Sequence, residues 1–276
     1  MIKNIIFTGG GFKGWAYIGT LQVLDEYAYI FKDISQVIGV SIGSLFGLFY
    51  VLGIKWNFIL DYVMNLNFKD FMDIDIDNIL TNQSLLKGNK FTEIIKEIIS
   101  LKIDPDITFI ELKRYSKILF TVNALNINDS KLEYFNYKLT PDIKVVDAVR
   151  ASCSLPLLFP PYILKGKYYY DGGICNNCPL NLVDEVESIA FDVSHWIGEN
   201  NSSVKLVDLL NCLITITNKN TYNNDSDIIY KVLDSKFKDE MVNLNQNKDD
   251  IFNIYMNGYI NSKNIIFKNY IALPAP

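Results

Sequence analysis

At residues 36–52 the chain reads QVIGVSIGSLFGLFYVL. A short apolar run leads into Gly39-Val40-Ser41-Ile42-Gly43, and an apolar helical run follows. A nucleophilic serine on a sharp strand-to-helix turn needs small residues two positions before and after it, because larger side chains would collide across the turn. The helix that follows points its N-terminus at the reacting centre. The stretch therefore predicts a strand, a nucleophile elbow with Gly39 and Gly43 around Ser41, and a helix.

The same region raises the question of a membrane span. It carries no charge from residue 34 to residue 54, and about 20 uncharged apolar residues can cross a bilayer. Polar residues and glycines interrupt the run, which favours a buried strand, a turn and a buried helix. We therefore expect no transmembrane helix, because a doubly covered parallel strand and a core helix explain the apolarity.

Predicted strands and helices alternate along the first part of the chain. Residues 3–8 read as a strand, residues 14–27 as a helix, residues 36–40 as a strand and residues 41–52 as a helix. This βαβα opening predicts an α/β fold.

Weaker patterns extend to the C-terminus. They predict helices at 55–66, 90–101, 143–151, 204–215 and 250–259, strands at 118–126, 131–137, 188–193 and 264–272, and a hairpin at 162–170. No repeat or linker divides the sequence, so we expect one domain over residues 1–276.

Composition narrows the classes of protein. With 276 residues, 49% hydrophobic and 21% charged, the chain can bury a sizeable core. A net charge of −5 and scattered lysines argue against nucleic-acid binding. The apolar stretch at the N-terminus is too short for a signal peptide and runs into glycines, so we expect a first strand and a cytoplasmic protein.

Four cysteines, at positions 153, 175, 178 and 212, have no regular framework spacing. Cys175 and Cys178 form a CxxC pair, but a zinc site needs a second pair or nearby histidines, and the chain has one histidine. We expect neither a metal nor a cofactor.

A glycine-rich loop, Gly9-Gly10-Gly11-Phe12-Lys13-Gly14, separates the first strand from the first helix. Such a loop exposes backbone N–H groups and can hold an anion. The dinucleotide pattern fits, but the second strand ends at Gly39 without the required acid, and no Gly-Lys-Ser/Thr follows for a P-loop. An oxyanion hole and a plain tight turn remain.

Asp171-Gly172-Gly173 follows a run of tyrosines. An acid at a strand end, beside two glycines, can reach a serine across the top of a sheet, although Asp-Gly is also a common turn. His195 is the single histidine, so it is the one candidate base for a Ser-His-Asp triad.

Together these motifs resemble those of the patatin-like phospholipase family. The glycine loop, the elbow, Ala151-Ser152-Cys153-Ser154-Leu155-Pro156 and Asp171-Gly172-Gly173 stand in the family's order within residues 4–195, and Asn177 and Pro179 also look familiar. Residues 204–276 carry no recognised motif.

The resemblance implies a three-layer α/β/α fold with a mainly parallel sheet, and a lipid acyl hydrolase acting at a membrane or micelle surface. Ser41 would be the nucleophile and Asp171 the base of a dyad without histidine. Gly10 and Gly11 would supply the oxyanion amides, within a loop that spans Gly9 to Gly14 and includes Lys13. A carboxylate base needs a raised pKa, so we expect Asp171 to be buried beside Ser41.

Two alternatives stay open. An ordinary α/β-hydrolase would use Ser41, Asp171 and His195, but it builds several strands before its elbow, and its oxyanion loop follows a later strand. A non-catalytic lipid-binding relative would keep the fold, although it has no need of Ser41, Asp171 and the glycine loop together.

Overall fold

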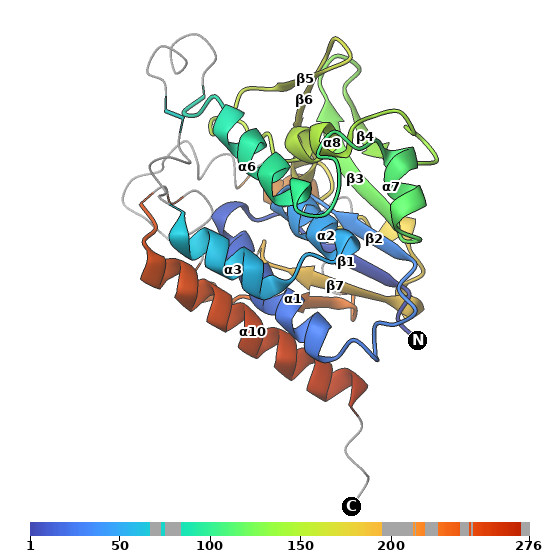
Figure 1. Cartoon of the computed structure of the whole chain (residues 1–276), viewed down its shortest axis with the longest axis vertical. Helices are drawn as coiled ribbons and strands as arrows, with labels where there is room; N and C mark the ends of the chain where they lie inside the picture. Colours follow the sequence, from blue (N-terminus) through green and yellow to red (C-terminus); the bar gives the residue numbers. More distant parts are fainter. Residues whose placement is uncertain are drawn as a thin grey trace, which may run out of the picture.

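A computed structural model describes residues 1–66, 73–74, 84–194, 212, 214–218, 226–237, 243 and 245–271. Within these residues helices flank one eight-stranded sheet (Figure 1). The strands are β1 (Asn4–Phe7), β2 (Gln36–Gly39), β3 (Leu119–Asn126), β4 (Lys131–Phe135), β5 (Tyr162–Leu164), β6 (Lys167–Asp171), β7 (Ser188–Asp192) and β8 (Ile229–Lys231). The helices are α1 (Ala16–Glu26), α2 (Ile42–Leu52), α3 (Trp56–Asn65), α6 (Asn89–Ser100), α7 (Phe109–Tyr115), α8 (Val145–Ser152) and α10 (Lys248–Tyr270). Short 3₁₀ helices are η1 (Gly11–Trp15), η2 (Gly172–Ile174), η3 (Leu180–Leu182) and η4 (Glu185–Glu187).

The strand order places the first strand inside the sheet. The order is β5-β6-β3-β2-β1-β7-β8, with β4 paired to β3. Strands β3, β2, β1, β7 and β8 are parallel, whereas β4, β5 and β6 join antiparallel. From β1 the order runs through β2 to β3 on one side, and β7 and β8 lie on the other side. The carboxyl end of β1 therefore lies at a switch point between β1 and β7, and α/β sheets bind ligands at such points.

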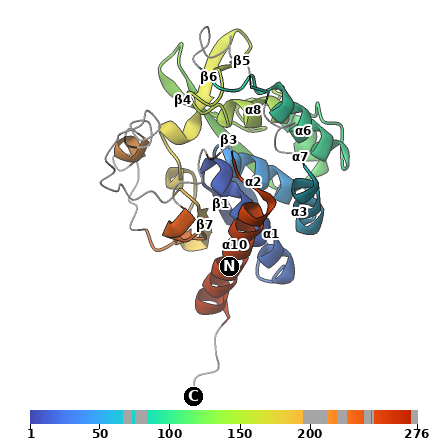
Figure 2. The ribbon, with the colours of Figure 1, turned by 90° about the vertical axis from the view of Figure 1, so that its left-hand side faces the viewer.

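Both faces of the central strands are covered, as the apolar strand sequences predict. Alternate side chains point to opposite faces, so Ile5 and Val37 join the large core under the helices. Ile6 and Ile38 join a smaller core on the other face, together with Leu180 of η3. Helices, sheet and the covering of the second face form the predicted three layers (Figure 2).

The uncharged region at 34–54 is divided as predicted. It forms β2, a turn at Ser41 and α2, which ends at Gly53 in a left-handed conformation. Over the part of the chain that the structure describes, no helix combines the length and apolarity needed to cross a bilayer.

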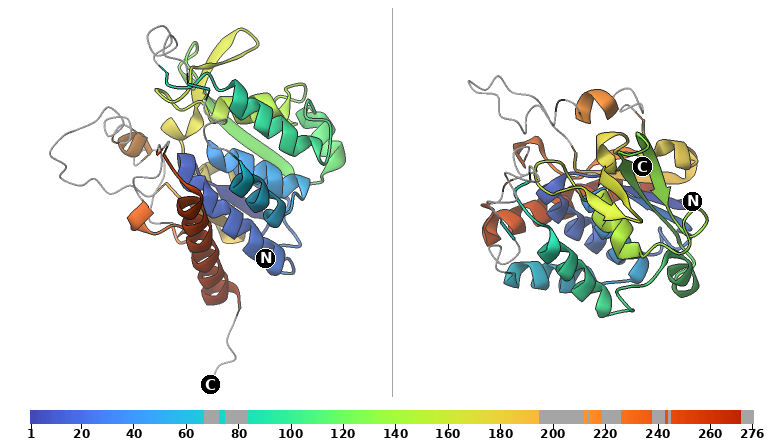
Figure 3. Two further views of the ribbon diagram at one scale, coloured as in Figure 1. Left: turned by 60° about the vertical axis from the view of Figure 1, so that its left-hand side comes forward. Right: turned by 90° about the horizontal axis from the view of Figure 1, so that it is seen from above.

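The prediction of a strand at residues 264–272 is wrong. Residues up to Tyr270 belong to α10, a helix of 23 residues that lies along α1 (Figures 1 and 3). Its buried residues recur at helical spacing: Ile251, Ile254, Tyr255, Gly258, Ser262 and Ile266. Packing on α1, including a 2.9 Å hydrogen bond between Thr20 and Ser262, overrides the strand preference of the isoleucines and aromatics.

Other predicted elements agree in kind. The helix predicted at 143–151 is α8, and the predicted hairpin is β5–β6, which turns at Lys165 and Gly166 with positive φ. The helix predicted at 204–215 lies almost entirely outside the described residues.

The elbow glycine Gly43 is expected to tolerate no side chain. A Cβ there would overlap the backbone oxygens of Phe7 and Thr8, which the sheet holds in place. We expect Gly43→Ala to lower the free energy of unfolding by more than about 2 kcal/mol, measured by denaturant titration. Gly47→Ala is the matched control, because its Cβ would meet nothing nearer than 3.2 Å. Equal unfolding midpoints for the two variants would contradict this steric account.

Candidate active site

Ser41 is held in an unusual backbone conformation between β2 and α2. Its φ of 53° and ψ of −132° are rare for a residue with a side chain and mark functional sites when the surroundings enforce them. Here the Ser41 amide donates to Ser152 Oγ at 2.8 Å, and the Ser44 hydroxyl donates to the Ser41 carbonyl at 2.6 Å. These bonds fix the backbone amide and the backbone carbonyl of Ser41.

The glycine loop packs directly against this elbow. A Cβ on Gly9 would lie 2.7 Å from the Cβ of Ser41, so only glycine allows the approach. Gly10 and Gly11 line the hollow beside Ser41, and their amides have no hydrogen-bond acceptor within the described residues. An oxyanion hole requires amide donors that are available in this way. The Gly9 amide differs, because it already donates to Asn177 Oδ1 at 2.9 Å.

The other two predicted loop residues support this turn from behind. The amide of Lys13 donates to the Gly10 carbonyl at 3.3 Å, and Gly14 abuts Ile42. The Lys13 side chain is buried, which lowers the pKa of its amine to about 8 against the opposing effect of Asp192. Lys13 therefore lies beside the loop without offering its amide to a ligand.

The antiparallel strand β6 carries Asp171 to the elbow. Val122 of β3 pairs with Gly39, and two residues further along β3, Ala124 pairs with Asp171. This register sets Asp171 at the level of Ser41, just past the end of β2.

Asp171 is buried beside Ser41, as predicted. Only 3% of it is exposed, and burial raises the pKa of its carboxyl to about 7, although hydrogen bonding by the Ser41 hydroxyl and the Gly173 amide opposes the shift. The Gly173 amide donates to Asp171 Oδ1 at 2.8 Å, and Gly172 begins η2. A carboxyl with a pKa near neutrality can act as a proton acceptor at physiological pH.

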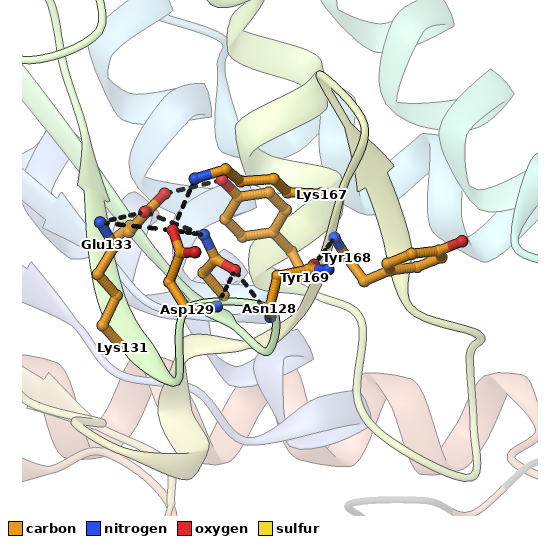
Figure 4. Close-up of polar contacts among 8 residues, drawn as sticks. Asn128, Asp129, Lys131, Glu133, Lys167, Tyr168 and Tyr169 are labelled. Atoms are coloured by element: carbon orange, nitrogen blue, oxygen red, sulfur yellow. Dashed lines mark hydrogen bonds and ion pairs between the residues drawn. The ribbon is translucent and has the colours of Figure 1, made fainter.

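A polar network fixes the strand that carries Asp171 (Figure 4). Tyr169 donates to Glu133 at 2.7 Å and Lys167 bonds Asp129 at 2.6 Å. The Tyr168 amide donates to the Asn128 side chain at 2.7 Å. The network ties β6 to the β3–β4 hairpin and so supports the register that positions Asp171.

Two hollows meet at Ser41. The first encloses about 840 Å³, open mouth included, and its lining is almost entirely apolar. It follows one face of α2 through Ile42, Leu45 and Phe49 and continues between α3 and α6. The second hollow, about 500 Å³, is lined by the glycine loop, Asp171 and polar groups such as Asn177.

The remaining candidate residues of the sequence are the single histidine and the CxxC pair. His195 lies outside the described residues. No disulfide joins Cys175 to Cys178, and no cluster of metal-ligating side chains occurs in the part of the chain that is described.

A family model for patatin-like phospholipase matches residues 5–184, a span that holds the glycine loop, the elbow and Asp171. The chain belongs to the patatin-like phospholipase family. A probable lipid hydrolase, 463L, of Invertebrate iridescent virus 6 is 29% identical to it over 187 residues. The alignment covers 65% of this patatin-like chain and 62% of the viral protein, so the chain spans about three fifths of that relative.

Solved structures confirm the patatin-like fold. VipD from Legionella pneumophila matches with a TM-score of 0.62 at 17% identity, covering 97% of this chain and 67% of VipD. The type III effector ExoU matches with a TM-score of 0.55 at 15% identity, covering 97% of this chain and 53% of ExoU. The sheet with its flanking helices is thus shared even where the sequences have diverged.

Hydrogen bonds of Asn177, which the sequence does not predict, hold the glycine loop of this patatin-like site. Asn177 bonds both polar groups of Gly9, while its own amide donates to Asn218 at 2.6 Å. Asn218 in turn donates to the Gly173 carbonyl at 2.8 Å. The pair ties the glycine loop to the Asp-Gly-Gly turn. The family resemblance points to Asn177 without giving it a role, and Asn218 stands in a part of the sequence without a motif.

Proposed function

We propose that this protein is a serine esterase that releases fatty acids from lipid esters through a Ser41–Asp171 dyad. The observation that carries the proposal is the strained Ser41 with its hydroxyl beside a buried carboxyl whose pKa is about 7. Membership of the patatin-like phospholipase family and the naming of a viral relative as a probable lipid hydrolase support the substrate class.

In the proposed mechanism Asp171 accepts the proton of the Ser41 hydroxyl as its oxygen attacks the ester carbonyl. The amides of Gly10 and Gly11 stabilise the resulting oxyanion. Collapse of the tetrahedral intermediate breaks the ester bond, and the protonated Asp171 returns its proton to the leaving alcohol. An acyl-enzyme remains on Ser41. Asp171 then takes a proton from water, whose oxygen attacks the acyl carbonyl. The bond between Ser41 Oγ and the acyl carbon breaks, the fatty acid leaves, and Asp171 returns the proton to the Ser41 oxygen.

The two hollows fit the two halves of a lipid ester. The apolar hollow along α2 has an almost entirely apolar lining and offers almost no polar contact, which suits an acyl chain. The more polar hollow around Asn177 suits the alcohol part, which leaves on the side of Asp171. Because such substrates gather in membranes and micelles, we propose that the enzyme acts at their surface.

A serine-reactive fluorophosphonate probe and a lipid panel test this function. We expect the probe to label the wild-type protein, and we expect release of fatty acid from at least one phospholipid, lysophospholipid, galactolipid or triacylglycerol. Labelling without release from any of these lipids would contradict the substrate class. Absence of both would favour a non-catalytic lipid-binding protein.

The apolar hollow makes a separate prediction about acyl-chain length. Leu45 lies one helical turn along α2 from Ser41 and lines the hollow. Leu45→Trp is expected to obstruct the hollow and to lower kcat/KM for long-chain esters by about 10- to 100-fold, since each kcal/mol of lost chain binding is several-fold in rate. Short-chain esters and fluorophosphonate labelling should change little. Equal losses on both ester classes would mean that the chain lies elsewhere.

A further inference from the structure

The Arg150 guanidinium is buried in the interior beside the site. Only two of the 26 basic residues of the chain are arginines, and of these Arg114 is exposed whereas Arg150 is 2% exposed. No ion pair formed within the described residues involves Arg150. Burying a charge without a carboxylate is costly, so its contacts must compensate.

Those contacts join two parts of the site. The first part is the wall of the apolar hollow. The guanidinium lies 4.3 Å from the ring centroid of Phe159 and 5.7 Å from that of Phe91. These two rings stack with centroids 5.6 Å apart, and both line the hollow. Arg150 also donates to the Gly88 carbonyl, at the start of α6, at 3.3 Å.

The second part is the strand of the proposed base. Arg150 Nη1 donates to Ser154 Oγ at 2.9 Å, and the Ser154 hydroxyl donates back to the Arg150 carbonyl at 2.9 Å. The Ser154 carbonyl then accepts the amide of Asp171 at 3.0 Å. One side chain therefore connects the aromatic wall of the hollow to the backbone of Asp171.

We propose that Arg150 is a positioning residue that couples occupancy of the apolar hollow to the alignment of Asp171. The proposal rests on the esterase function proposed above. An acyl chain in the hollow packs on the Phe91–Phe159 stack and restricts its motion, and the guanidinium passes this restriction to Ser154 and thus to the base. Binding free energy from the remote chain is then used at the reacting carbonyl.

Lysine cannot replace arginine in this role. The planar guanidinium stacks on the rings while its fork of donors reaches Gly88 and Ser154 in fixed directions, whereas an ammonium is a compact charge on a flexible stem. Arg150→Lys should keep a cation at the position and lose the coupling.

The test compares acetyl and palmitoyl nitrophenyl esters on the full chain. We expect Arg150→Lys to lower kcat on the palmitoyl ester by about 10- to 100-fold, and on the acetyl ester, which leaves the hollow empty, by less than about threefold. Ser154→Ala removes the hydroxyl that accepts the hydrogen bond of the guanidinium. The double variant of Arg150→Lys and Ser154→Ala should therefore have nearly the same kcat on the palmitoyl ester as Arg150→Lys alone.

Two controls separate coupling from loss of structure. Arg114→Lys makes the same chemical change at an exposed position near the end of α7 and should leave kcat on both esters unchanged. Leu112→Ala removes a buried side chain of α7 that lines neither hollow. This variant should lower thermal stability and should lower kcat on both esters by the same factor. The proposal would be overturned if Arg150→Lys lowered kcat equally on the two esters, or if the effects of Arg150→Lys and Ser154→Ala on kcat were additive.

A failure of the esterase function itself would be recognised separately. If the wild-type protein hydrolyses neither nitrophenyl ester and none of the lipids of the panel, the function proposed above is wrong. The coupling is then read from the rates at which short- and long-chain fluorophosphonates label Ser41. Arg150→Lys should slow the long-chain probe alone, and equal slowing of both probes would refute the coupling.

Discussion

Ser41→Ala is expected to abolish fluorophosphonate labelling and to lower kcat for any lipid ester by about 10⁴- to 10⁶-fold, the range found when a serine nucleophile is removed. Without the hydroxyl no acyl-enzyme can form, and the remaining rate comes from substrate binding and the loop amides alone. Labelling measured by gel fluorescence and fatty-acid release measured by titration report the two effects.

The same variant should fold normally. Alanine keeps the Ser41 backbone amide that donates to Ser152 and the carbonyl that accepts from Ser44. Its thermal unfolding should therefore lie close to that of the wild-type protein. Labelling that persists at another residue, or turnover reduced less than about tenfold, would show that Ser41 is not the nucleophile.

Asp171→Asn is expected to lower kcat by about 10³-fold or more, because the amide cannot accept the serine proton. In the wild-type protein the rate should fall as the pH drops below about 7, where Asp171 becomes protonated. The Asp171→Asn variant should lack this acidic limb in its residual rate. A wild-type profile that stays flat from about pH 5 to pH 8 would contradict a base with this pKa.

Stability should change in the opposite direction from activity. The folded carboxyl has a pKa of about 7 against an ordinary value of 3.8, so the native state binds the proton more tightly than the unfolded state. The free energy of unfolding therefore falls by at most about 4 kcal/mol as the pH rises from about 3.8 to about 7. Asp171→Asn removes the ionisation and should raise the melting temperature at pH 8 more than at pH 4.

The local parts of the site could be predicted because their signals lie in consecutive residues. Gly39, Ser41 and Gly43 carry the steric requirement of the elbow within one pentapeptide. The burial of Asp171 also followed, since a carboxylate base needs a raised pKa. Its distance from Ser41 in the sequence left the pairing to the family resemblance, and the β3–β6 register accounts for it in space.

The hydrogen bonds from Ser41 to Ser152 and from Asn177 to Asn218 could not be predicted, because tertiary packing alone brings these residues together. Ser152 lies 111 residues from Ser41, and Asn218 lies 41 residues from Asn177, with no periodic pattern to link them. Residue preference alone predicts a C-terminal strand, whereas the buried positions of α10 follow a helical period that only its packing on α1 explains.

We propose that Ser41 works with Asp171 and without a histidine. The most direct measurement compares kcat of His195→Ala and Asp171→Asn on the same lipid ester. We expect His195→Ala to keep kcat within about threefold of the wild type, because a dyad has no histidine to lose, and Asp171→Asn to lower kcat by about 10³-fold. A loss for His195→Ala as large as that for Asp171→Asn would contradict the dyad and establish a Ser41–Asp171–His195 triad.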